Sequence, residues 1–156
     1  QSNKQIVIKT FSNGNSWNDV GNHIVGDSLL GFVIDPTTNI PYVITKSSNV
    51  ITTSYFTGKG STWTTVGAGI AASDAKLFIS PVTHQLYMTT NTADNAFSKI
   101  MKYDGTNWVV IGSPFVNSLG KVASIGFNQV SDMPYAVLLL SGQTSGTYQL
   151  GISKLQ

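Results

Sequence analysis

Three residue types are absent from this chain of 156 residues: cysteine, arginine and glutamate. Without cysteine no disulfide forms, and the sequence is compatible with any redox compartment. Without arginine or glutamate, every mechanism that depends on either side chain is excluded. Charged residues make up only 10% of the chain and the formal net charge is +2. With so few, separated lysines and no arginine for guanine or phosphate contacts, we expect no nucleic-acid partner.

Long hydrophobic runs are also missing. The longest, residues 135–140, is far shorter than the roughly 20 residues of a membrane-spanning helix, so we expect no membrane insertion. No stretch keeps a helical period of 3.6 residues over two turns, so we expect no helix. A hydrophobic content of 41% with 10% aromatic residues is enough for one folded domain with a core.

Two further expectations concern the location of the protein and the origin of the chain. Serine, threonine, asparagine and glycine are abundant, which suits an extracellular surface, so we expect a secreted or cell-surface protein. The chain begins at Gln1, so we expect a processed chain or part of a larger protein.

The sequence repeats itself about every 45 residues. The pattern Trp-x-x-(Val/Ile)-Gly occurs three times, and its tryptophans are spaced by 46 and 45 residues: Trp17, Trp63 and Trp108. A second marker keeps nearly the same step, with tyrosines spaced by 45 and 48 residues: Tyr42, Tyr87 and Tyr135. We expect these six aromatic residues to form the structural core of the repeats. A period of this length is typical of propeller blades.

Each repeat is predicted to contain four short strands, here named A to D from the inside outward. In the second repeat they are residues 77–80, 85–90, 98–103 and 107–112. The turns between strands A and B end in Asn39, His84 and Asp132, residue types that tolerate left-handed backbone. Asp104 and Gly105 form a strong hairpin signal between strands C and D.

These motifs resemble the β-propeller repeats found in tandem in secreted and cell-surface proteins, in the style of kelch and Asp-box blades. The resemblance implies an all-β fold with four-stranded antiparallel blades, about three in this chain. The predicted single repeat domain, 1–156, divides into a partial blade with strands C and D, then three repeats, the last without its fourth strand: 1–21, 22–67, 68–112 and 113–156. A different β architecture, such as a sandwich, is the alternative.

The strand count does not close a ring. The chain starts with strands C and D, residues 5–11 and 16–20, and ends with strand C, residues 148–154. A propeller needs about four to eight blades. We therefore expect an incomplete propeller, completed by other copies, extended into a filament, or continued by the rest of a longer propeller.

No catalytic group can be assembled from the sequence, and we expect no cofactor and no metal site. His23 lies between strands D and A, whereas His84 lies in a turn at the opposite edge. Asp27 and Asp74 occupy equivalent places before strand A, where a paired-carboxylate glycosidase is conceivable. Strand-entry capping explains both residues more simply.

The leading hypothesis is a noncatalytic extracellular structural or adhesive module that assembles with itself through strand edges. One alternative is a lectin that binds glycans through its loops, with these candidate ligand-binding residues: His23, Asp27, Asp74, Asn91, Asn95 and Asn117. Another alternative is a fragment of a propeller enzyme, such as a glycosidase, whose catalytic residues lie elsewhere.

Overall fold

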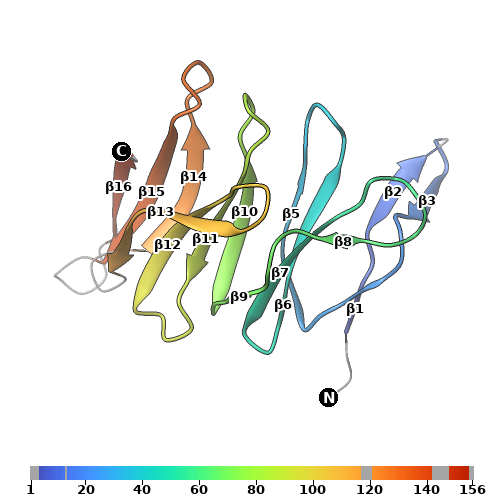
Figure 1. Ribbon diagram of the computed structural model, residues 1–156, viewed down its shortest axis with the longest axis horizontal. Coiled ribbons are helices and arrows are strands. Elements are labelled where there is room, and N and C mark those ends of the chain that lie inside the picture. Colours follow the sequence, from blue (N-terminus) through green and yellow to red (C-terminus); the bar gives the residue numbers. More distant parts are fainter. Residues whose placement is uncertain (1–3, 13, 117–120, 142–147, 155–156) are drawn as a thin grey trace.

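The computed structural model describes residues 4–12, 14–116, 121–141 and 148–154. This part of the chain contains sixteen strands and no helix, which confirms the predicted all-β class. The strands form several small antiparallel sheets that follow one another along the chain and lie side by side (Figure 1). Within the described residues, the sheets do not close into a ring or a barrel.

Two small two-stranded sheets begin the chain. Strand β2 (Lys9–Ser12) pairs with β3 (Ser16–Asp19), and Phe11 lies opposite Trp17 in this hairpin. Strand β1 (Gln5–Ile6) pairs instead with β4 (Ile24–Val25). The single strand expected over residues 5–11 is therefore divided between two partners.

The next sheet has the order β5-β6-β7-β8, with β9 also paired to β7. Its strands are β5 (Ser28–Ile34), β6 (Pro41–Ser47), β7 (Val50–Tyr55), β8 (Thr64–Thr65) and β9 (Ile70–Ala71). The third sheet has the order β10-β11-β12-β13. Its strands are β10 (Asp74–Ile79), β11 (Leu86–Asn91), β12 (Phe97–Tyr103) and β13 (Trp108–Val116).

The last sheet contains three strands in the order β14-β15-β16. They are β14 (Lys121–Phe127), β15 (Pro134–Ser141) and β16 (Tyr148–Lys154). The predicted bounds of the final strand, residues 148–154, are confirmed. Among the described residues β16 has one paired edge, toward β15.

The glycine of each Trp-x-x-(Val/Ile)-Gly motif ends or bends the outer strand. Gly21, Gly67 and Gly112 have φ values of 69°, 65° and 67°, in the left-handed region that glycine enters at no steric cost. After Gly67 the chain returns to the same sheet as the short strand β9, which pairs with β7, whereas after Gly21 it forms the short strand β4, which pairs with β1. Neither strand was expected from the sequence, because two residues are too few to show a period.

The turns between the first two strands of the three larger sheets have the predicted backbone. Asn39, His84 and Asp132 have φ values of 55°, 57° and 55°. Each donates its backbone N–H to the carbonyl four residues earlier: Asp35, Ser80 and Asn128. The left-handed residue in each turn is thus one that accepts this conformation at moderate cost.

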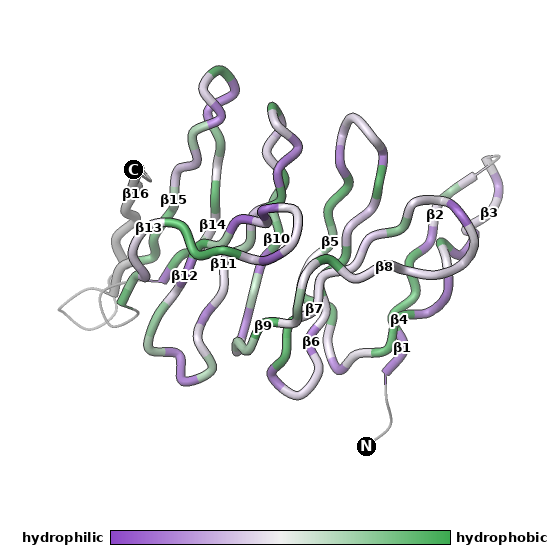
Figure 2. The backbone as a smooth tube through the Cα atoms, viewed as in Figure 1, coloured by the Kyte–Doolittle hydropathy of each residue, from purple (hydrophilic) through white to green (hydrophobic). Residues whose placement is uncertain are grey.

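The core lies between neighbouring sheets. One cluster joins Ile44 and Ile51 of the β5–β8 sheet to Leu77 and Met88 of the next. A second cluster joins that sheet to the last one, through residues that include Tyr87 and Val122. Hydrophobic segments lie mainly in the strands (Figure 2).

Strand β11 is buried on both faces. Leu86 and Met88 belong to the first cluster, whereas Tyr87 belongs to the second, because successive side chains of a strand point to opposite sides. A strand covered on both faces has no need of alternating polarity. This explains why the predicted strands alternate unevenly.

Candidate functional site

An open groove of about 710 Å³ lies between the first hairpin and the β5–β8 sheet. Phe32 and Ile34 of β5 line it, and both side chains are exposed, by 43% and 52%. Their neighbours Leu30 and Val33 instead pack against the core cluster. Strand β5 therefore presents one face to the protein interior and leaves an apolar face in the groove.

The groove exists because the neighbouring sheet is short. Hairpin β2–β3 contains two strands, whereas the sheets that follow contain three to five. Strand β5 packs against β10 of the next sheet on its other side. In the part of the chain that the structure describes, no equivalent inner strand packs against Phe32 and Ile34.

A charged pair forms part of the groove's polar rim. Lys9 and Asp19 face each other across hairpin β2–β3 with Nζ and Oδ1 2.5 Å apart, and both line the groove. The hydrogen bond from Lys9 holds the pKa of Asp19 below its ordinary value. His23 Nε2 lies 3.6 Å from the other carboxylate oxygen, and His23 Nδ1 lies 3.0 Å from Gln5 Oε1. Because both of its side chains are exposed, the Lys9–Asp19 ion pair contributes little to the stability of the fold.

The tryptophan motif forms a contact between consecutive repeats. The indole Nε1–H of Trp63 donates to the carbonyl of Val20 at 3.1 Å, and that of Trp108 donates to the carbonyl of Val66 at the same distance. Each indole also covers the glycine that follows the carbonyl. A Cβ added to Gly21 would lie 2.8 Å from Trp63 Nε1, and one added to Gly67 would lie 3.1 Å from Trp108 Cδ1.

Trp17 differs from the core role expected for it, because its side chain is 65% exposed. It keeps the intrarepeat aromatic partner, Phe11, with ring centroids 5.3 Å apart. Among the described residues, no Val-Gly segment precedes Trp17 for its indole to cover. Trp63 and Trp108 are partly buried because each has such a segment.

The three tyrosines of the repeat are less exposed than Trp17, in better agreement with the expected core position. Tyr87 is buried at 5% exposure, and burial, together with the charge of Asp132, raises its pKa. Tyr42 is half-buried and stacks on Tyr55 with ring centroids 5.8 Å apart. Tyr135 is also half-buried.

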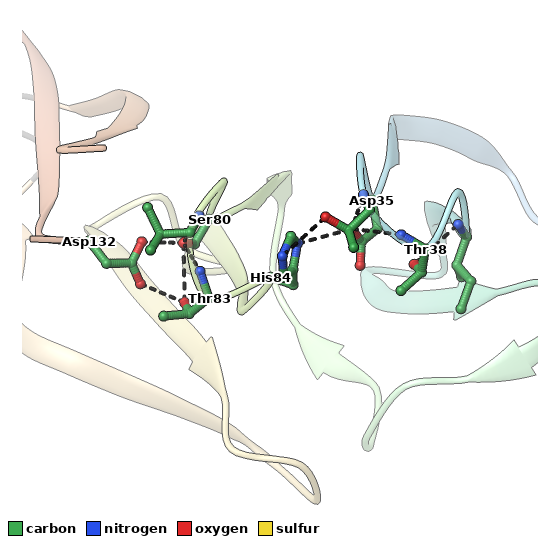
Figure 3. A network of polar contacts seen from close by, with 9 residues as sticks. Asp35, Thr38, Ser80, Thr83, His84 and Asp132 are labelled. Carbon is green, nitrogen blue, oxygen red and sulfur yellow. Dashed lines mark hydrogen bonds and ion pairs between the residues drawn. The ribbon is translucent and has the colours of Figure 1, made fainter. Parts of the chain in front are cut away.

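A row of polar contacts joins the turns of consecutive sheets (Figure 3). His84 Nδ1 lies 3.1 Å from Asp35 Oδ1, and His84 Nε2 lies 3.2 Å from Thr37 Oγ1. One sheet further along, the hydroxyls of Ser80 and Thr83 donate to the carboxylate of Asp132. In both cases the side chain of the left-handed residue of one turn contacts the side chain of the first residue of the preceding turn: His84 contacts Asp35, and Asp132 contacts Ser80.

Asp35 is the most deeply buried of the acidic groups in these turns, at 4% exposure. Burial alone would raise its pKa. The hydrogen bonds from Thr37 and Thr38, together with the charge of His84, outweigh that effect and hold the pKa of Asp35 below its ordinary value. The charged form of Asp35 therefore stabilises the turn and its contact with the next sheet.

The predicted ligand-binding residues lie at separate places. Asp74 and Asn91 are opposite each other in β10 and β11, and Asn95 accepts a hydrogen bond at 2.7 Å from Ser73, beside Asp74. Asp27 instead accepts a 2.9 Å hydrogen bond from the backbone N–H of Ser48. His23 lies at the first hairpin. Asn117 lies outside the described residues.

These side chains already bind parts of the chain itself. Asp74 Oδ1 accepts from the backbone N–H of Ala75 at 2.9 Å, and Asn91 Oδ1 accepts from Ser98 Oγ at 2.8 Å. Asp27 thus contacts the turn between β6 and β7, whereas Asp74 contacts the start of β10. No group of three or more metal-ligating side chains occurs within the described ranges.

Sequence reasoning missed the groove. The sequence feature that could have indicated it is the apolar run from Leu29 to Ile34, because the residues on both faces of this strand are apolar. Such a run predicts a strand to be covered on both faces, yet only one face is covered by the described chain.

In the part of the chain that the structure describes, no helix is long and apolar enough to cross a membrane. Comparisons with protein families, curated proteins and solved structures found no match for this chain.

Proposed function

We propose that this chain is a noncatalytic structural or adhesive module, an incomplete β-propeller that joins other copies of itself through its two open ends. In this proposal each sheet is one blade or part of one. The protein acts at an extracellular or cell surface, where the rigid row of sheets supplies a scaffold.

The observation that carries the proposal is the mismatch between the two ends. The N-terminal hairpin β2–β3 has two strands, and the groove beside it leaves Phe32 and Ile34 exposed. The C-terminal sheet β14–β16 has three strands. The strands missing at one end are thus present at the other, and a groove with an apolar floor is what an inner pair of strands would cover.

The geometry of the acidic residues favours a structural role over catalysis. A glycosidase of the usual kind needs two carboxyl groups that face one substrate. Asp27 and Asp74 each accept a hydrogen bond from the backbone of a separate turn or strand start, which is the capping role that such residues commonly have.

Light scattering coupled to size-exclusion chromatography tests the proposal. We expect the native mass to exceed the 16.7 kDa of one chain, either as a discrete closed particle or as a series that grows with concentration. A mass that stays at 16.7 kDa from micromolar to submillimolar concentration would contradict self-assembly.

Glycan binding is the second candidate. It is favoured by three residues near one end of strands β10 and β11: Asp74 and Asn91 are opposite each other, and Asn95 accepts a hydrogen bond from Ser73 beside Asp74. Carboxylate and amide groups suit sugar hydroxyls. A glycan array probed with the wild type and with Asp74→Ala separates the two candidates. Binding that the substitution abolishes would support a lectin, and an array without hits would remove this candidate.

A further inference from the structure

We propose that two copies of this chain join head to tail, with Trp17 of one copy seated on Ile111 and Gly112 of the other. This inference rests on the proposed function and specifies the contact that performs it. The partner is a second copy because the chain itself contains both halves of a contact that it makes twice internally.

The two internal contacts define the geometry. In both, an indole N–H donates to the carbonyl of the valine and covers the glycine of the preceding motif. In both, the tryptophan packs on an aromatic residue of its own repeat, with ring centroids 5.5 Å apart: Phe56 with Trp63 and Tyr103 with Trp108. The contact thus has three parts: an aromatic pair, an indole donor and a Val-Gly acceptor.

Trp17 is the donor half without its acceptor. Its pair with Phe11, at 5.3 Å, matches the two internal pairs, so its ring is held in the same way. Its side chain is 65% exposed, and its Nε1–H makes no hydrogen bond to the described residues. An exposed, preorganised tryptophan is typical of the centre of a protein interface.

Ile111 and Gly112 are the acceptor half without its indole. Gly112 has φ of 67°, close to the 69° and 65° of Gly21 and Gly67. The chain has three tryptophans, of which Trp63 and Trp108 are used by the first two motifs. Trp17 lies on the first hairpin, at the opposite end of the row of sheets (Figure 1). A tryptophan from a second copy completes the series.

The row of polar contacts between consecutive described turns also ends, on each side, in a turn that contacts only one other turn. Internally, His84 reaches Asp35 and Asp132 reaches Ser80. The residues left over are Asn39, which has no preceding turn in the described chain, and Asn128, which begins the last turn. The same one-sheet step that seats Trp17 on Gly112 brings Asn39 of the second copy to Asn128 of the first. One placement thus continues both rows of contacts, and two amide side chains are able to hydrogen-bond each other.

This placement also fills the groove. In it, β14 and β15 of the first copy lie beside β5 of the second and cover Phe32 and Ile34. The shared sheet would receive three strands from one copy and two from the other, whereas the complete path in the third sheet has four. One third strand must therefore give up its place, and we expect it to be β16, because β2 carries the Phe11 ring that packs against Trp17.

Trp17→Ala tests the contact without disturbing the interior, because the side chain is exposed. We expect the dissociation constant of the assembly to rise at least about thirtyfold, as for a central interface tryptophan, with an unchanged thermal midpoint of the single chain. Val82→Ala, at an exposed site in the middle turn, is the matched control and should leave assembly intact.

Mixing two variants tests the direction of the contact. Gly112→Ala should block the acceptor end, since a Cβ there crowds the incoming indole, while Trp17→Ala blocks the donor end. Neither variant should assemble alone, but an equimolar mixture should give a dimer of twice 16.7 kDa that grows no further. If Gly112→Ala does not fold, the dilution series of Trp17→Ala decides alone.

The outcomes separate the inference from the proposed function. An assembled wild type whose dissociation constant is unaffected by Trp17→Ala would overturn the inference and leave the proposed function standing. A wild type that is monomeric at every concentration would overturn both.

Discussion

The contact between Trp108 and Gly67 is expected to be a main source of rigidity between the two complete sheets, and one substitution isolates its contribution. In Gly67→Ala the new Cβ would lie 3.1 Å from Trp108 Cδ1 and 3.3 Å from Tyr103 Cε2. The indole would have to move, which weakens its hydrogen bond to the carbonyl of Val66.

Two terms contribute to the expected loss of unfolding free energy. Gly67 has φ of 65°, and placing an L residue in this region costs about 1–2 kcal/mol. Crowding in a packed contact costs a further ~1–3 kcal/mol. The sum for Gly67→Ala is therefore about 2–5 kcal/mol, a large part of the stability of a small domain.

Gly60→Ala is the matched control, because Gly60 has φ of 69° but nothing within 4 Å of its added Cβ. It should lose only the backbone term, about 1–2 kcal/mol. Urea unfolding followed by tryptophan fluorescence and circular dichroism measures both variants against the wild type. Equal losses in the two variants would refute the reasoning, since the contact with Trp108 would then contribute nothing beyond backbone strain.

Three further predictions follow from other parts of the fold. Trp63→Phe removes the hydrogen bond to Val20 and should cost about 0.5–1.5 kcal/mol in urea unfolding. Trp17→Phe should leave the stability of the single chain unchanged, because the Trp17 indole N–H donates to no described residue and phenylalanine keeps a ring beside Phe11. The pKa of Asp35 is lowered on folding, so its contribution is complete above the unfolded value of 3.8 and is lost as pH falls through the folded value; the urea midpoint of the wild type should decline with acidification, and that of Asp35→Asn should decline less. Met88→Ala empties a site with 0% exposure and should cost about 2–5 kcal/mol, which a thermal melt would register as a lower midpoint; an unchanged midpoint would contradict the assigned core.

Much of the fold was predictable from the repeats. The Trp-x-x-(Val/Ile)-Gly period located the outer strands, and the residue types at Asn39, His84 and Asp132 predicted left-handed turns that the structure confirms. Both signals are local, since they depend on backbone preferences that a few residues express.

The candidate site was less predictable, because it depends on what is missing beside a strand. The apolar run of β5 predicts two covered faces, yet Phe32 and Ile34 are exposed in the groove. Likewise the motif places Trp17 with the other two tryptophans, but its exposure follows from its position in the first hairpin. Sequence periodicity identifies equivalent residues and cannot tell which of them lacks a neighbour.

Electron microscopy of the assembled wild type tests the central claim most directly. We expect particles, rings or filaments, in which the row of sheets continues across each junction between copies and the side chain of Trp17 lies over Gly112 of the neighbour. Particles in which the groove beside Phe32 and Ile34 stays open, or copies joined through other faces, would contradict it.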